Sequence, residues 1–195
     1  MKKKMILFTL VLILVIISAF CILNFSSTAR DINHAVNRPG SVPVNIIYEQ
    51  KGSKGSMVFC ISSGVEGLFT AAVKENMFGY RLAYWVAQGD IKITIDKVGL
   101  TESYFPNINK ITPPMFYGIV GNPEIKRVKI IEKKRNIEAE AKIVDANGYR
   151  LWLINMENFQ GSQFDIIGLS DDDKEISHRH DNISPLTVEQ KPTKM

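Results

Sequence analysis

The fold is decided by one stretch of the sequence, Ile137-Glu-Ala-Glu-Ala-Lys-Ile-Val-Asp-Ala-Asn-Gly-Tyr-Arg-Leu-Trp-Leu-Ile154. Its first part, Ile137 to Val144, largely alternates charged with apolar residues, which is typical of a strand with one face in a core. Asn147-Gly148 can take the positive φ angles that a tight primed turn requires. Tyr149 to Ile154 then returns as a second strand. The stretch therefore predicts an antiparallel β-hairpin.

Two segments nearer the N-terminus show the same period of two. Asp90 to Asp96 alternates strictly and would place its three isoleucines on one face of a strand. Phe78 to Val86 would carry an apolar stripe on one face and leave Trp85 on the other face, together with Arg81. Further strands are expected at 45–49, 57–61, 68–74, 115–120, 125–132 and 163–169, with a last hairpin turn at 171–174.

Glycine and proline residues separate these short segments at the intervals expected of an all-β domain. No stretch between them carries the roughly 10 to 15 residues of helical period that a parallel crossover needs. The sequence therefore predicts an all-β fold, mainly antiparallel, built as a sandwich or an open barrel. The longest break without periodicity, residues 99–114, is expected to be a loop that either carries function or covers an open end.

The first 25 residues predict one transmembrane helix. Lys2-Lys3-Lys4 precedes an apolar run from Met5 to Phe25, and no further charge occurs before Arg30. Such a run, as a helix, spans the roughly 30 Å of bilayer hydrocarbon. The lysines favour a cytoplasmic N-terminus and an extracellular C-terminal domain in a single-pass cell-membrane protein.

Two processing events compete with this uncleaved signal-anchor. Ser27-Thr28-Ala29 offers small residues for cleavage after Ala29, but the apolar run is longer than the roughly 7 to 15 residues typical of a cleaved signal peptide. Lipid attachment at Cys21 is disfavoured by the large Phe20 before it, where a lipoprotein motif has a small residue.

The chain after the anchor is expected to hold three parts: a polar linker at 26–44, an extracytoplasmic β domain at 45–181 and a disordered tail at 182–195. Asp31 could cap one or two helical turns inside the linker, although no apolar stripe long enough to bury is visible there.

Charge argues against a nucleic-acid partner. The net charge is +4, but Lys2, Lys3 and Lys4 supply three of the 24 basic residues, so the rest of the chain has 21 basic and 20 acidic residues. A nucleic-acid binder concentrates its basic residues on one face. The unpaired Cys60 lies on an apolar strand and is interpreted as a small buried hydrophobe rather than as a nucleophile.

Two weak candidate sites stand out, and each has a plain structural alternative. His178 and His180 would project from one face of a strand and could bind a metal ion, but a solvated turn explains them equally well. Aromatic residues could form a binding surface for a wall polymer, although most aromatic residues in strands pack a core. The candidates for that surface are Trp85, Tyr104, Phe105 and Trp152. The sequence contains no motif that implies a cofactor or a catalytic residue.

Four segments carry a resemblance, and they are Phe78–Arg81, Tyr117–Val128, Gly148–Trp152 and Ile166–Ser170. With the lysine-rich anchor, they resemble a family of small signal-anchored exported proteins of Gram-positive bacilli whose function is unknown. The resemblance implies location and fold style, not activity.

The expected function is that of an anchored extracytoplasmic module. It would contact membrane lipid through its helix and bind, or be accessory to, an envelope protein or a cell-wall polymer. The alternative is a cell-envelope enzyme of the hydrolase class, with a site gathered from distant residues. If His178, His180 and a carboxylate converged around one point within ligand distance, the binding module would be abandoned for that alternative.

Overall fold

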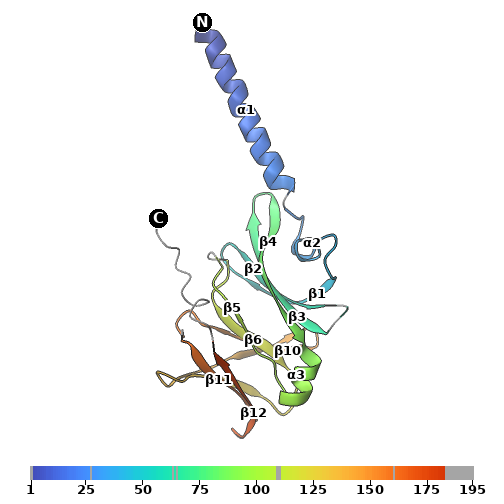
Figure 1. Ribbon diagram of the computed structural model, residues 1–195, viewed down its shortest axis with the longest axis vertical. Helices are drawn as coiled ribbons and strands as arrows, with labels where there is room; N and C mark the ends of the chain where they lie inside the picture. The colour runs from blue at the N-terminus through green and yellow to red at the C-terminus, as the bar shows by residue number, and fades with distance from the viewer. Residues whose placement is uncertain are drawn as a thin grey trace.

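The computed structural model describes residues 2–26, 28–62, 64, 66–108, 111–159 and 161–182, which form three four-stranded antiparallel sheets (Figure 1). The first sheet has the order β1 (Val44–Lys51), β2 (Gly55–Ser62), β3 (Gly67–Asn76), β4 (Gly79–Asp90). The middle sheet has the order β5 (Ser103–Phe105), β6 (Met115–Val120), β10 (Tyr149–Asn155), β9 (Lys142–Ala146). The third sheet has the order β12 (Glu175–Asn182), β11 (Gln163–Leu169), β7 (Arg127–Glu132), β8 (Ile137–Glu140). The predicted all-β, mainly antiparallel fold is confirmed.

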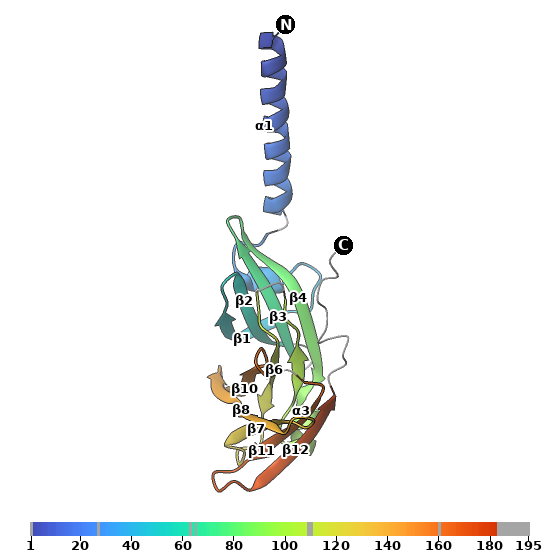
Figure 2. The ribbon, with the colours of Figure 1, turned by 90° about the vertical axis from the view of Figure 1, so that its left-hand side faces the viewer.

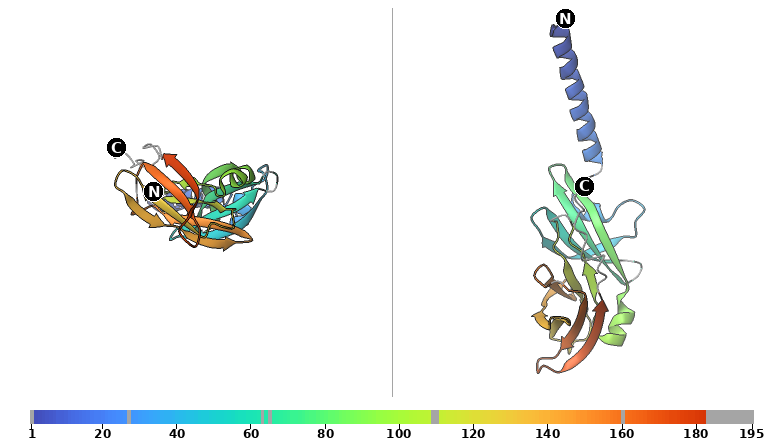
Figure 3. Two further views of the ribbon diagram at one scale, coloured as in Figure 1. Left: turned by 90° about the horizontal axis from the view of Figure 1, so that it is seen from below. Right: turned by 60° about the vertical axis from the view of Figure 1, so that its left-hand side comes forward.

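The middle sheet is buried on both faces, which makes the domain a sandwich of three layers. Tyr117 on β6 packs edge-on against Phe59 of the first sheet, with ring centroids 5.3 Å apart. The preceding residue, Phe116, points the other way and packs against Phe164 of the third sheet at 5.1 Å. The outer sheets, β1–β4 and the sheet that contains β11 and β12, lie on opposite sides of the domain (Figure 3). Burial on both sides explains why β6 is a continuous apolar run rather than an alternating one.

The predicted hairpin is present, with one difference. Asn147 and Gly148 have φ angles of 55° and 86°, as a primed turn requires, and join β9 to β10. However, the first predicted strand is shared between two sheets. Residues up to Glu140 pair with β7 in the third sheet, whereas residues from Lys142 onward pair with β10 in the middle sheet. The chain changes sheets at Ala141, whose N–H donates to the Val128 carbonyl.

The predicted strand at Asp90–Asp96 is wrong, because the segment forms helix α3 (Ile91–Val98). Asp90 is the N-cap, and its carboxylate accepts hydrogen bonds from the N–H groups of Lys92 and Ile93 at 3.0 and 3.3 Å. Gly99 ends the helix with a φ of 82°, and its N–H donates to the Ile95 carbonyl. Capping at both ends therefore outweighs the alternation of the isoleucines.

Asp90→Ala is expected to lower the free energy of unfolding by about 0.5–2 kcal/mol, because it leaves two N–H groups of the first turn unpaired. Chemical denaturation of the full chain in detergent micelles measures this loss. Asp96→Ala is the matched control, since it removes an exposed carboxylate of the same helix that makes no cap, and should stay within about 0.5 kcal/mol. Equal effects for both substitutions would contradict the capped helix.

The apolar stripe predicted for Phe78–Val86 is also divided. Ala83 has no partner in the pairing of β3 with β4, which makes it a β-bulge, and a bulge exchanges the two faces of a strand. Before the bulge, Leu82 packs on the outer face of the first sheet. After it, Tyr84 packs inward against Phe105 at 5.4 Å. The stripe therefore faces both ways.

The segment predicted as a polar linker, 26–44, packs against the domain from Ala29 onward. Asp31 caps helix α2 (Ile32–Val36), as predicted, by accepting a hydrogen bond from the His34 N–H at 2.8 Å. Contrary to expectation, α2 buries apolar residues: Ala35 and Val36 pack on the outer face of the first sheet. The tail predicted at 182–195 lies outside the described residues, except Asn182, the last residue of β12.

Helix α1 (Lys2–Ser26) precedes the domain and projects from one end of it (Figure 2). Its described side chains, those of Ile6 and residues 8–22, are exposed. Across the described residues, no helix has both the length and the apolarity that crossing a membrane requires.

Candidate functional site

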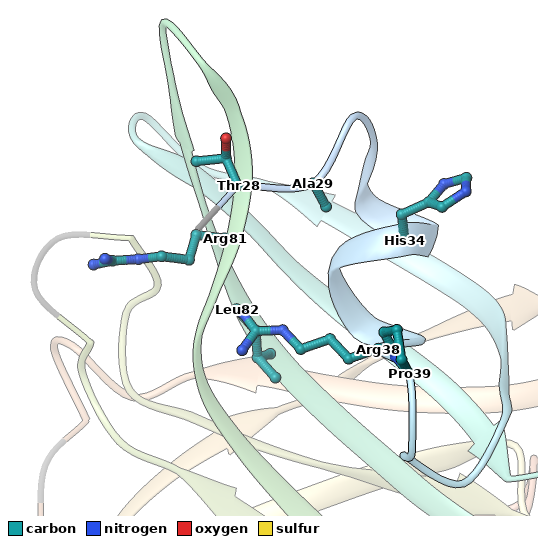
Figure 4. A pocket seen from close by; sticks show the side chains of 7 residues that line it. All are labelled: Thr28, Ala29, His34, Arg38, Pro39, Arg81 and Leu82. Carbon is teal, nitrogen blue, oxygen red and sulfur yellow. The ribbon is translucent and has the colours of Figure 1, made fainter. Parts of the chain in front are cut away.

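An open pocket of about 640 Å³ lies between helix α2 and the start of β4 (Figure 4). Three segments meet there: the chain that follows α1, helix α2 with the loop after it, and the start of β4. The lining residues are Thr28, Ala29, His34, Arg38, Pro39, Arg81 and Leu82. We call this the α2–β4 pocket.

The backbone that builds the pocket is fixed by hydrogen bonds. Ala29 and Tyr80 form a β-bridge, with N–H···O distances of 2.7 and 2.9 Å, and this holds the chain after α1 against β4. On the other side, the Asn37 side chain accepts from the Val44 N–H at 2.7 Å and donates to the Val44 carbonyl at 3.0 Å. This pair of bonds closes the loop after α2, which carries Arg38.

The pocket is cationic. Its lining contains two arginines and one histidine but no carboxylate. Neither Arg38 nor Arg81 forms a salt bridge with any residue that the structure describes. His34 is paired with Asp31 at 2.8 Å, and hydrogen bonds from the His34 backbone and ring lower the pKa of that carboxyl below its usual value. Asp31 is thus an anion at neutral pH that is engaged by His34.

The two guanidinium groups do not point at one another. Arg38 extends from the loop after α2 toward Leu82 on β4, whereas Arg81 leaves β4 in another direction (Figure 4). Guanidinium groups bind phosphate and carboxylate oxygens through two parallel hydrogen bonds. Two separated guanidiniums that form no salt bridge within the described part of the chain suit an extended anion that reaches both of them better than a single small ion held between them.

The two candidate metal ligands meet a shared carboxylate instead of a metal site. Asp165 on β11 faces β12, where His180 Nδ1 lies 2.8 Å and His178 Nε2 3.4 Å from its Oδ1 atom. The Asp165 oxygen itself occupies the point where the two rings converge. No group of three or more His, Cys, Asp or Glu side chains in the described ranges could hold a metal ion.

The cluster of Asp165, His178, His180 and Lys133 is held together by ion pairs and hydrogen bonds. Asp165 is 17 % exposed, and Lys133 lies 3.6 Å from its second oxygen. Partial burial raises the pKa of Asp165, but hydrogen bonds from His180 and His178 and the charge of Lys133 outweigh it, so the pKa is lowered overall. The arrangement could exchange protons with a substrate, and it also serves simply to join β11 to β12.

The predicted aromatic surface is wrong for two of its four residues. Trp152 and Phe105 are fully buried in the cores on either side of the middle sheet, so neither can touch a ligand. Tyr104 is partly buried and packs edge-on against Phe116. Trp85 is the exception, as expected from its position on β4: it is 54 % exposed and stacks on Phe69 at 5.5 Å.

Two further expectations are resolved by the fold. Cys60 is fully buried, as expected, and burial raises the pKa of its thiol to about 12, so it is not a nucleophile at neutral pH. The predicted loop at 99–114 instead contains the short strand β5, which pairs with β6, and Thr101 beside it is fully buried. Leu100, Phe105 and Ile111 of the same segment are also buried, so much of its described part belongs to the core.

Sequence reasoning missed the α2–β4 pocket altogether. Arg38 and Arg81 are 43 positions apart, and the residues between them do not form a local motif. The available signals were the cap at Asp31 and the polar turn after α2, which predict where α2 lies but not what it packs against. No protein-family model matches the chain, and no curated protein or solved structure shows detectable similarity to it.

Proposed function

We propose that this protein is a membrane-anchored, extracytoplasmic binding module that holds a phosphate-bearing envelope component in the α2–β4 pocket. The phosphate would belong either to a lipid headgroup or to a wall polymer. The observation that carries the proposal is the pair of arginines, Arg38 and Arg81, that form no salt bridge with the described residues and line a pocket without carboxylates that begins just after α1.

Helix α1 and the sequence around it support the proposed location. Helix α1 exposes a dense set of apolar side chains, including Leu10, Ile13 and Phe20, and contiguous apolar surfaces of this kind mark contact with membrane or protein. The apolar run in the sequence, Met5–Phe25, extends beyond the described side chains at both ends. Lys2, Lys3 and Lys4 before it favour a cytoplasmic N-terminus and an external domain.

The position of the pocket supports the ligand class. The chain passes directly from α1 to Thr28 and Ala29, which line the pocket, so a bilayer around α1 would place the pocket close to its surface. Phosphate groups of lipids and of anionic polymers are concentrated there. Arginine binds such groups through charge-assisted hydrogen bonds worth about 1.5–3 kcal/mol each.

Binding is tested with the full chain in nanodiscs of zwitterionic lipid, titrated with soluble poly(glycerol phosphate). Arg38→Ala and Arg81→Ala should each weaken binding by about tenfold or more. Arg30→Ala is the matched control: it removes the same charge from an exposed neighbour that does not line the pocket, and it should have a much smaller effect.

The source of the phosphate is separated by repeating the polymer titration in nanodiscs in which anionic lipid replaces part of the zwitterionic lipid. If the anionic lipid weakens polymer binding by the unsubstituted chain more than it weakens the residual binding by Arg38→Ala, the pocket holds a headgroup. Equal weakening by Arg30→Ala would show that only overall charge matters and would refute the pocket. A full chain that fails to float with liposomes, or whose domain resists protease added outside intact cells, would refute the anchored location.

A hydrolase of the cell envelope is the second candidate function, and the cluster of Asp165, His178 and His180 favours it. Two histidines that share a carboxylate could supply a general base. Such an enzyme should lose turnover of wall material on Asp165→Asn while keeping it on Arg38→Ala. The α2–β4 pocket predicts the reverse dependence for binding.

A further inference from the structure

We infer that the tip of the β3–β4 hairpin, residues 76–79, docks into the headgroup layer of the same bilayer that holds α1. This inference rests on the proposed anchoring of α1 but not on the ligand of the α2–β4 pocket. The tip would give the domain a second contact with the membrane and so fix its orientation.

The tip presents an apolar side chain to solvent. Met77 is 88 % exposed, the most exposed large apolar residue described in the domain, and Phe78 follows it. A tight turn between two strands is ordinarily polar, because its side chains face water. An unbranched, flexible methionine at such a position is suited to an irregular apolar environment.

Hydrogen bonds place the tip beside the end of α1. Ala29 is bridged to Tyr80, and the Thr28 hydroxyl donates to the Phe78 carbonyl at 3.2 Å. Ala29 comes three positions after Ser26, so the bridge lies within about 10 Å of the helix end. Met77 lies three residues beyond Tyr80, again about 10 Å along the hairpin. The tip can therefore reach the level of the end of α1, and both side views show it just short of that end (Figures 1 and 2).

The order of side chains along the hairpin matches a bilayer interface. The apolar tip comes first and Tyr80 next, followed by Lys74 and Arg81, which are direct partners across the two strands. Aromatic rings favour the headgroup level, and basic residues just outside it are attracted to anionic lipid. Glu75 opposes this attraction, but its carboxylate lies 3.4 Å from the Tyr80 hydroxyl. The occupant is the bilayer, because α1 would already hold the tip at its surface.

The test uses the full chain with Met77→Cys in a Cys21→Ser background, labelled with an environment-sensitive dye and reconstituted into liposomes. Cys60 is buried and should not react under native conditions. We expect the emission at position 77 to shift to shorter wavelength and to lose most of its intensity to a nitroxide on shallow positions of the lipid. Ile93→Cys is the matched control: it is 53 % exposed on α3, at the far end of the domain from α1, and should show neither change (Figure 3).

Emission at position 77 that matches position 93 in liposomes that float would overturn the docking while the anchoring stands. A short-wavelength emission that lipid nitroxide does not quench would show that protein covers the tip, which also overturns it. Failure of the chain to float would instead refute the proposed anchoring. Arg38→Ala should leave the label at position 77 unchanged, so loss of pocket binding and loss of docking are distinguishable.

Discussion

Trp152→Ala should lower the free energy of unfolding by about 3–5 kcal/mol, as expected when a large aromatic side chain is removed from a packed core. Trp152 is fully buried between the middle and third sheets. Its indole N–H donates to the Thr101 carbonyl at 2.8 Å, and the substitution leaves that buried acceptor without this donor. Urea denaturation of the full chain in micelles, followed by circular dichroism, measures the loss.

The chain supplies its own control, because Trp85 is its only other tryptophan and is more than half exposed. Trp85→Ala should cost much less, about 1 kcal/mol or below, since it loses the stacking on Phe69 but opens no cavity. A larger loss for Trp85→Ala than for Trp152→Ala would mean that the three-layer packing is wrong. It would also support the prediction from the sequence that Trp152 belongs to an aromatic binding surface.

Local patterns predicted much of this fold, because many of its strands are defined by neighbours in sequence. The hairpin of β9 and β10, Lys142 to Asn155, needs only its strand pattern and the Asn147-Gly148 turn, and both are visible in one short window. The two strand predictions that were wrong, at Asp90–Asp96 and within Phe78–Val86, failed because local features outweighed the alternation of apolar and polar residues. At Ile91–Asp96, a capping aspartate and a terminal glycine favour a helix, and at Ala83 a bulge exchanges the faces of a strand.

The stacking of the sheets could not be predicted in the same way. Alternation shows that a strand has two different faces, but it does not show which other sheet covers each face. Trp152 illustrates the limit: on a strand of an outer sheet it could have faced solvent, whereas the middle sheet has no solvent face at this position. The division of one predicted strand between two sheets at Ala141 is likewise set by distant partners.

The candidate site was unpredictable for a related reason. The α2–β4 pocket depends on the Ala29–Tyr80 bridge, a pairing across 51 positions that no local pattern indicates. By contrast, the histidines at 178 and 180 were found from their spacing, but the residue that decides their chemistry, Asp165, comes from another strand. The sequence spacing indicated that His178 and His180 share one face of a strand, and the register of β11 with β12 showed that Asp165 is their partner.

Gly118→Ala should lower the free energy of unfolding by about 3 kcal/mol or more, which is at the upper end for overpacking a core. A Cβ atom at Gly118 would overlap the Thr101 carbonyl oxygen and lie 2.7 Å from Trp152 Nε1, so it would disturb the same hydrogen bond. The atom in question is the backbone carbonyl oxygen of Thr101. The N–H of the same residue donates to the Ile119 carbonyl at 2.9 Å, so the Thr101 backbone cannot move aside without loss of stability. Denaturation in micelles again measures the effect.

Gly89→Ala is the matched control for this substitution, because Gly89 is also a strand glycine but has open space around the new Cβ. It should change stability by less than about 1 kcal/mol. A double-mutant cycle with Trp152→Phe then shows how much of the stability lost in Gly118→Ala is due to the Trp152 indole and how much to the Thr101 backbone. If the indole carries much of it, Gly118→Ala should cost at least about 0.5 kcal/mol less in the Trp152→Phe background. If the cost is unchanged, the Thr101 backbone alone requires glycine at position 118, and the segment between α3 and β5 rather than the tryptophan limits the space beside β6.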